Sequence, residues 1–417
     1  MLVCSFLFVR SQIDYDNPSV RERILETAVK RASKWMALRE EATPLIGQVG
    51  GRGRNKKPVL TLAADYILKP LVTDPRGLRE IAFYEAIETV TQQHNANSLT
   101  QNNTTVHTYA ALFLGGQEGK KTGPIARTWE MIDTFSLAFA MLLGYRFVQD
   151  QQEELREAWK AIKREMDSIH RLAKFVPRYY GVVGQSGVSS EHPFGVNEDA
   201  YIMFQSVTGI FSQPCVIDLK MGTHTYEPDA PSEKIARESG KYPMQQEFGF
   251  RIVGMRFYDP THKQADEKGY RTFDKEYGRS LTTKESVVDA LRTFFSGGDP
   301  TALSEEMEIN GKNDMPPLVL SSSRVRLKAI SDVHLNLRSL RRWFEENRSL
   351  QFVASSLLIV YEGDPLKGNG DVTTLKLIDF GHARRNFGGD PGYTHGLRTL
   401  THMLGDIVQE EKDRIQQ

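Results

Sequence analysis

The sequence has little of what marks secreted, membrane-spanning or nucleic-acid-binding proteins. Only two of its 417 residues are cysteines, Cys4 and Cys215, so neither a disulfide framework nor a cysteine zinc site is expected. Its two long apolar stretches, residues 1–9 and 135–145, are too short to cross a membrane, and the first lacks a basic signal-peptide region. Basic and acidic residues balance at 53 each, so no overall field attracts nucleic acid. We therefore expect an intracellular protein, in the cytoplasm or the nucleus, without nucleic acid and without stable membrane insertion.

The chain is long enough for two core regions, and its patterns divide it accordingly. Residues 1–43 predict an N-terminal helical extension, because residues 21–38 form a charged amphipathic pattern of helical period. Residues 44–205 predict a strand-rich half with a helical insertion at about 92–172, in which one apolar stripe runs from Leu155 to Ile169. Residues 206–417 predict a half of mixed helices and strands.

Local patterns give the elements expected inside these halves. A helix should begin at Asp74 and Pro75, an N-cap followed by a first-turn proline. Further helices are expected at 231–242, 284–295 and 333–346, and strands at 174–183, 198–207, 248–258, 354–363 and 375–383.

The stretch PCVIDLKMG, residues 214–222, places an acid and a base in an otherwise apolar strand. Because side chains alternate along a strand, Asp218 and Lys220 share one face, and Ile217 and Leu219 share the other. A surface ion pair, which contributes at most about 1 kcal/mol, would explain the two charges. The functional alternative is that the strand aims both groups at a ligand.

A second stretch, LKLIDFGHA, places Asp379 at the end of a strand, before the turn that Gly381 allows. A carboxylate there could hold an Mg²⁺ that bridges nucleotide phosphates, or it could simply cap the next segment. Lys69 in YILKPL lies on an expected strand of the first half, from which a lysine could reach the same phosphates. Taken alone, a strand lysine is usually just exposed.

Three motifs in this order resemble those of the inositol polyphosphate kinase family. The family's P-x-x-x-D-x-K-x-G strand is matched at Pro214, Asp218, Lys220 and Gly222, its S-S-L-L strand at 355–358, and its I-D-F segment at 378–380. The resemblance covers about 44–89 and 174–404 of the sequence. It leaves out the N-terminal helix and the segment at about 92–172.

The resemblance implies an α+β, two-lobed kinase-like fold with a strand-rich N-lobe and a mixed helix–sheet C-lobe. It also implies ATP and Mg²⁺ as cofactors. Asp218 would hold the ribose hydroxyls, and Lys220 on the same face would meet the substrate and the transferred phosphate. The remaining nucleotide contacts would be Lys69 to the phosphates, Asp379 to Mg²⁺, and the backbone around Gln205 and Val207 to the adenine. The family usually has glutamate at the position of Gln205, a difference that matters little if the backbone makes the contact.

The implied substrate is a soluble inositol polyphosphate, and several phosphates on one ring require clustered cations. Lys234, Arg237 and Lys241 fall at i, i+3 and i+7, so they are expected on one face of a helix within a substrate-binding segment at about 228–245. Glu233 and Glu238 could instead pair with Arg237 and Lys234 on a solvated face. By resemblance, the substrate contacts are Lys220, Lys234, Lys241, Arg76 and His382, whereas Arg237 has no counterpart.

Within the family, stretches such as SEKIARESGKYPM and DKEYGRSLT resemble the multikinase branch, whereas QVGG, LKPL and DLKMG resemble the hexakisphosphate kinases. The short interval between Lys220 and Phe248 argues against the trisphosphate 3-kinases, which carry a longer insertion there. We expect a monomeric kinase of the multikinase type that phosphorylates hydroxyls of inositol tris- and tetrakisphosphates. The alternatives are a hexakisphosphate kinase that makes pyrophosphates, and a catalytically inactive inositol-phosphate-binding scaffold.

Overall fold

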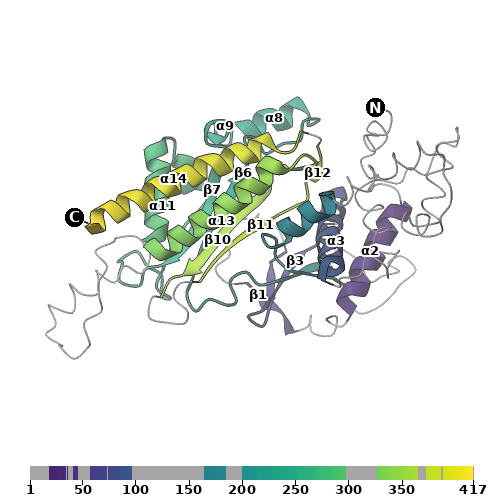
Figure 1. The fold of residues 1–417 in the computed structure, drawn as a ribbon. Coiled ribbons are helices and arrows are strands. Elements are labelled where there is room, and N and C mark those ends of the chain that lie inside the picture. The colour runs from purple at the N-terminus through teal and green to yellow at the C-terminus, as the bar shows by residue number, and fades with distance from the viewer. Residues whose placement is uncertain are drawn as a thin grey trace.

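The computed structural model shows an α+β fold built on two five-stranded antiparallel sheets and their covering helices (Figure 1). It describes residues 18–33, 35, 41–45, 57–72, 74–95, 164–184, 200–296, 326–364, 372–386 and 388–416. Most of the expected insertion, including the stretch from Leu155 to residue 163, lies outside this description. Within it, none of the helices is both long and apolar enough to cross a membrane.

The first sheet belongs to the N-terminal half. Its strand order is β1 (Thr43–Pro44), β2 (Leu60–Leu62), β3 (Tyr66–Pro70), β5 (Tyr201–Gln205) and β4 (Tyr179–Val183). Helices α2 (Pro18–Ala32) and α3 (Pro75–Asn95) pack beside it. The predicted start of α3 is observed, since the Asp74 carboxylate accepts the Arg76 backbone N–H at 2.9 Å.

Helix α2 is an integral part of this half. Ala28 is fully buried in the main core, and Arg31 donates to the fully buried carboxylate of Glu85 on α3, with Nη2 and Oε2 2.6 Å apart. Gly181 on β4 has a φ of 113°, and a Cβ there would lie 2.4 Å from the carbonyl oxygen of Ala28. A glycine at 181 therefore lets α2 lie directly on the sheet.

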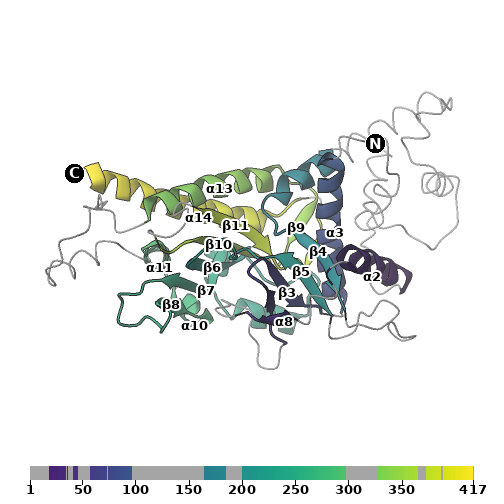
Figure 2. The same ribbon diagram turned by 90° about the horizontal axis from the view of Figure 1, so that it is seen from below.

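The second sheet belongs to the C-terminal half and has β6 at its centre. Its order is β11 (Thr373–Ile378), β10 (Ser356–Glu362), β6 (Pro214–Met221), β7 (Phe250–Tyr258) and β8 (Tyr270–Phe273). Helices α11 (Lys284–Phe295), α13 (Leu327–Glu346) and α14 (Pro391–Gln416) cover one side of it, with the shorter α8 (Ser232–Ser239) on the other side (Figure 2). Two further short helices, α9 (Gln245–Phe248) and α10 (Lys275–Ser280), flank β7.

The alternation predicted for β6 is observed. Ile217, Leu219 and Met221 are fully buried in the core under the helices. Val216 belongs to a separate apolar cluster on the opposite face, the face that also carries Asp218 and Lys220. One strand thus anchors the core with one face and presents charge with the other.

Several elements differ from the sequence-based expectations. Helix α2 begins at Pro18, three residues before the predicted start, and ends at Ala32; the predicted end, residues 36–38, lies outside the described residues. The long helix α14 was not expected, because Gly392, Gly396 and Gly405 interrupt its apolar pattern. A small third sheet pairs β9 (Leu350–Phe352) with β12 (Ala383–Arg385), a contact between segments too distant in sequence for local patterns to reveal.

The described end of the expected insertion, residues 164–173, is helical and reaches the second half. The Trp343 indole on α13 donates to the backbone carbonyl of Ser168 at 2.7 Å. Arg385 on β12 pairs with Glu165 at 2.6 Å. This end of the segment therefore connects the first sheet to α13 and β12.

Candidate nucleotide and substrate site

The three motif strands converge because of their register. Ser356 on β10 lies opposite Lys220 on β6 and also opposite Ile378, the last residue of β11. Asp379, the next residue, therefore emerges at the same edge of the sheet as Lys220. The Lys220 Nζ lies 3.7 Å from Asp379 Oδ2 and donates to the carbonyl of Ala354 at 2.9 Å.

Lys69 brings the first sheet to this edge. Its Nζ lies 2.7 Å from Asp379 Oδ1 and 2.7 Å from Oε1 of Glu80 on α3. Burial by itself would lower the pKa of Lys69, but Asp379 and Glu80 raise that pKa above its ordinary value. The lysine is thus a fixed positive charge held between the two halves.

Asp379 is the centre of this charge cluster. Burial opposes its ionisation, but Lys69 and Lys220 hold the pKa of the carboxyl well below its usual range. Its side chain is 42% exposed, so the carboxylate remains accessible. The backbone of Asp379 has a φ of 66°, a left-handed conformation that aspartate and asparagine tolerate better than most residues.

Asp218 differs from Asp379 in its surroundings. It is 6% exposed, and burial raises the pKa of its carboxyl to about 6, a change that Lys220 only partly offsets. Its Oδ1 and the Ser356 hydroxyl are both buried on this face, and the hydroxyl lies close enough to Asp218 to lower the pKa of the carboxyl slightly. A hydroxyl group that donated to Oδ1 would stabilise the ionised form of this carboxyl.

Arg251 on β7 adds a positive charge beside Lys220, its partner across the strand pair. Its Nη1 donates to Gln245 Oε1 at 3.1 Å, and the Gln245 amide donates in turn to the carbonyl of Gly222 at 2.6 Å. Burial, followed by the charge of Arg279, lowers the pKa of Arg251. In the described part of the chain this guanidinium forms no ion pair with a carboxylate, although it lies on the face that carries Lys220.

The segment after β5 leads from the first sheet to the second. The N–H groups of Gln205 and Ser206 are already used, donating to the carbonyls of Arg178 and Asp65 at 2.8 and 2.7 Å. Val207 follows, and its side chain packs on the apolar cluster opposite the main core. That cluster consists of Phe211, Val216 and Val360 with Val207, Leu358 and Val372 packed against it. It offers a flat aromatic ligand an apolar surface next to a backbone edge.

Two cations and a histidine surround Glu227. Arg79 Nη1 and His382 Nδ1 lie 2.9 and 3.1 Å from its Oε1, and Lys234 Nζ lies 3.8 Å from its Oε2. Burial would raise the pKa of Glu227, but His382, Arg79 and Lys234 hold it below its ordinary value. These three side chains come from α3, α8 and the segment after Asp379, so the two halves jointly form one basic patch.

Two expected substrate contacts lie elsewhere in this region. The Arg76 side chain turns back to Asp74, and its Nε donates to Oδ2 at 2.7 Å. Arg76 nevertheless lies next to Gly381, where an added Cβ would be 3.4 Å from the Arg76 Cβ.

Lys241 was expected on the helix that carries Lys234, and this was wrong. Helix α8 ends at Ser239, because glycine follows at 240 and Pro243 prevents continuation.

The ion pairs on this segment also differ from the expected ones. Lys241 pairs with Glu238 at 2.6 Å, and Arg237 Nε lies 3.7 Å from the same carboxylate. Lys234 is directed to Glu227 instead. Sequence reasoning missed Glu80, Glu227, Arg79 and Arg251; the only signal for Glu80 and Arg79 was their place on the helix that begins at Pro75.

The described residues favour a metal ion that is bound jointly by a protein carboxylate and by a ligand's phosphates. They do not favour a metal site formed by protein side chains alone. They contain no group of three or more histidine, cysteine, aspartate or glutamate side chains able to hold an ion. Asp379 offers an accessible carboxylate beside two lysines. The Asp379 carboxylate fits Mg²⁺, which binds through one or two carboxylates and completes its coordination shell with phosphate oxygens and water.

Comparison with known proteins defines the class. Residues 201–405, just under half of the chain, match the inositol polyphosphate kinase family. Human inositol polyphosphate multikinase is 34% identical over 208 residues, which cover 50% of this chain and 40% of that protein. Mouse inositol hexakisphosphate kinase 3 is 30% identical over 234 residues, which cover 51% of this chain and 52% of that protein.

Among solved structures, inositol phosphate multikinase from S. cerevisiae in complex with ADP and Mn²⁺ is similar at 22% identity and a TM-score of 0.43. The similarity covers 57% of this chain and 90% of that one. The chain thus spans about half or less of the length of the human and mouse relatives, and it shares sequence with two branches of one family.

Proposed function

We propose that this chain is an ATP- and Mg²⁺-dependent kinase that phosphorylates hydroxyl groups of soluble inositol tris- and tetrakisphosphates. The observation that carries this proposal is the meeting of Lys69, Lys220 and Asp379 at one sheet edge, where each lysine lies within ion-pair distance of Asp379. Phosphoryl transfer depends mainly on positioning and on stabilising charge that spreads over oxygens, and this arrangement supplies both.

The nucleotide would lie along the face of β6 that is turned away from α11, α13 and α14. Its adenine would pack on the apolar cluster that includes Val216 and Val360, with the backbone near Gln205 and Val207 at its edge. Its ribose hydroxyls would donate to the unused acceptor of Asp218. Lys69 would bind the phosphates, and Asp379 would hold Mg²⁺, which supplies positive charge to bridge them.

The inositol polyphosphate would bind at the basic patch around Glu227. Arg79, Lys234 and His382 already converge there, and Lys241 and Arg76 lie on the adjoining segments. Lys220, whose Nζ lies 3.7 Å from Asp379 Oδ2, would stabilise the phosphoryl group as it passes to the substrate hydroxyl. The half-buried charge of Arg251, next to Lys220, would be compensated by a substrate phosphate on the same face.

The test is incubation of the purified protein with ATP and Mg²⁺ and, separately, inositol tris-, tetrakis- and hexakisphosphate. Anion-exchange chromatography separates the products by their number of phosphates. Conversion of the tris- and tetrakisphosphates supports the proposal, and the Lys220→Ala variant is the negative control. No product from any of the three substrates would overturn it.

Inositol hexakisphosphate kinase is the second candidate, because a mouse enzyme of that name is 30% identical over 234 residues. Hexakisphosphate has no free hydroxyl, so a product from it must carry a pyrophosphate. Conversion of hexakisphosphate alone would therefore replace the first candidate by the second.

A further inference from the structure

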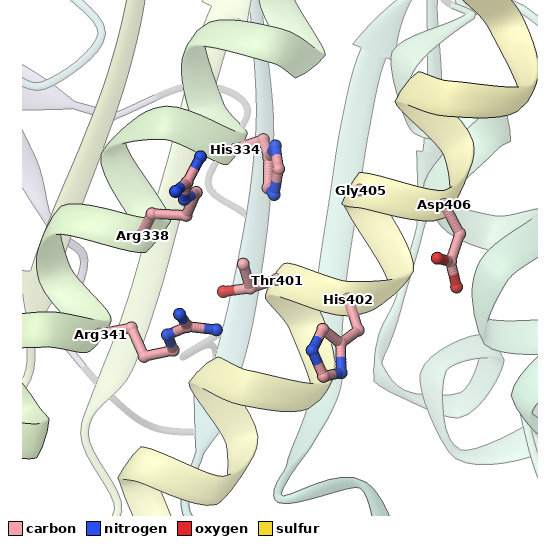
Figure 3. Close-up of a pocket in the computed structure, with 7 residues that line it drawn as sticks. All are labelled: His334, Arg338, Arg341, Thr401, His402, Gly405 and Asp406. Atoms are coloured by element: carbon pink, nitrogen blue, oxygen red, sulfur yellow. The ribbon is translucent and has the colours of Figure 1, made fainter.

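A cavity of about 260 Å³ lies between α13 and α14, on the helical side of the second sheet. Figure 2 shows these helices on the opposite side of the sheet from α8, so the cavity is separate from the candidate active site. Three lining residues come from α13 and four from α14 (Figure 3): His334, Arg338, Arg341, Thr401, His402, Gly405 and Asp406.

The arginines of this cavity have little negative charge to balance them. Arg338 forms no ion pair with any residue in the described part of the chain. Arg341 has only Glu345, whose Oε1 lies 3.7 Å from its Nε, and this buried Nε has no hydrogen-bond partner there. Asp406, on α14, points away from both arginines (Figure 3).

His334 is partly buried in the same cavity, whereas Arg338 and His402 are exposed at its mouth. Its Nε2 would lie 3.3 Å from a Cβ added at Gly405, so the absence of a side chain at 405 gives the ring its place against α14. Burial, together with the charges of Arg338, Arg341 and Lys412, lowers the pKa of His334. The nearby basic side chains therefore act in the same direction as burial on this imidazole.

We propose that this cavity binds a phosphate group, either free or carried by a small phosphorylated molecule. Two guanidinium groups one helical turn apart can each offer paired N–H donors to a tetrahedral dianion. The imidazoles of His334 and His402 add donors from both helices, and the Thr401 hydroxyl, which donates to Leu397 O at 2.6 Å, can only accept. The inference does not depend on the catalytic proposal.

The full chain, labelled with ¹⁵N only in histidine, allows a direct test by NMR at neutral pH. Adding inorganic phosphate should shift the ring signals of His334 and His402, assigned by single substitutions, and should raise the fraction of protonated His334. Sodium chloride at matched ionic strength is the control for screening. Inositol trisphosphate as a second ligand identifies the source, since the ligand that saturates these signals at the lower concentration is the better occupant.

Variants decide whether the arginines form the site. Replacing both Arg338→Gln and Arg341→Gln should weaken phosphate binding at least about tenfold, because two charge-assisted contacts are lost. Arg342→Gln, an exposed neighbour outside the cavity, should leave binding unchanged. The proposal fails if neither ligand shifts His334 beyond the chloride control, or if the double variant binds as well as wild type while remaining folded.

Discussion

The Nζ of Lys69 lies 2.7 Å from Oδ1 of Asp379, although the two residues are 310 positions apart in the sequence. One belongs to the first sheet and the other follows a strand of the second. This contact joins the two halves across the face where the nucleotide is proposed to bind. Phosphates and Mg²⁺ would bind between Lys69 and Asp379. The direct ion pair between these two side chains would then be replaced by contacts of each with the ligand.

Lys220→Ala should lower turnover by orders of magnitude. Its ammonium would act mainly on charge that develops during transfer, so kcat should fall far more than the KM for ATP rises. Steady-state kinetics with both substrates checks this. Near-normal turnover in a folded variant would remove Lys220 from the catalytic role.

Asp218→Asn should increase the stability of the unliganded protein at pH 7 to 8. The charge of this buried carboxylate is unfavourable, as its pKa of about 6 shows. Neutralising it should raise the free energy of unfolding by roughly 1 to 3 kcal/mol, since one pKa unit corresponds to about 1.4 kcal/mol. The same variant should bind ATP more weakly, so stability and function change in opposite directions.

Asp379→Asn is the matched comparison. The pKa of Asp379 is lowered, so its charge favours the folded state, and the variant should lower the unfolding free energy at the same pH. Asparagine keeps the left-handed backbone without new strain. Thermal or denaturant unfolding of both variants checks the pair, and a shift of the same sign in both would contradict the assignment.

Nucleoside binding should depend on pH through Asp218. The pKa of this carboxyl is about 6 in the folded protein and lower in the unfolded chain, so the folded state binds more protons between about pH 4 and 6. The contribution of Asp218 to the free energy of unfolding therefore decreases as the pH rises through that window. Below about pH 6 the protonated acid is a poorer acceptor for ribose hydroxyls. Adenosine has no titrating phosphate, and its inhibition constant should rise as pH falls through 6. In Asp218→Asn this dependence should disappear; an unchanged profile would assign it to another group.

Arg251→Gln should raise the KM for inositol polyphosphate about tenfold or more, and the KM for ATP much less. The reason is the loss of a charge-assisted contact beside Lys220. Arg271→Gln is the control, because Arg271 already pairs with Asp259 at 3.2 Å on the outer part of the sheet. Equal KM values for wild type and Arg251→Gln would mean that this arginine serves only to hold Gln245.

The parts of the fold that the sequence predicted are those set by local patterns. Alternation placed Asp218 and Lys220 on the face opposite Ile217, and the helix at 284–295 is observed with those bounds, because Thr283 and Ser286 cap each other. Helix α14 was missed because its glycines serve close packing, as at Gly396, where a Cβ would lie 2.1 Å from the Gly249 carbonyl oxygen.

The parts of the site that were missed depend on partners distant in sequence. Glu227 binds Arg79, 148 positions away, and His382, 155 positions away, so no local pattern links them. Arg251 became notable only when the strand register placed it beside Lys220. Charges can be counted from a sequence, but which of them compensate each other is decided by tertiary packing.

The two faces of β6 have a consequence for how such a protein can change. Ile217, Leu219 and Met221 are constrained by neighbours in the core, whereas the residues between them lie on the face where ligand is proposed to bind. Substitutions on the ligand face need not create a cavity, so ligand preference can drift while the fold persists. Divergence into enzymes with different substrates would then require only alternate positions of one strand and its neighbours to vary.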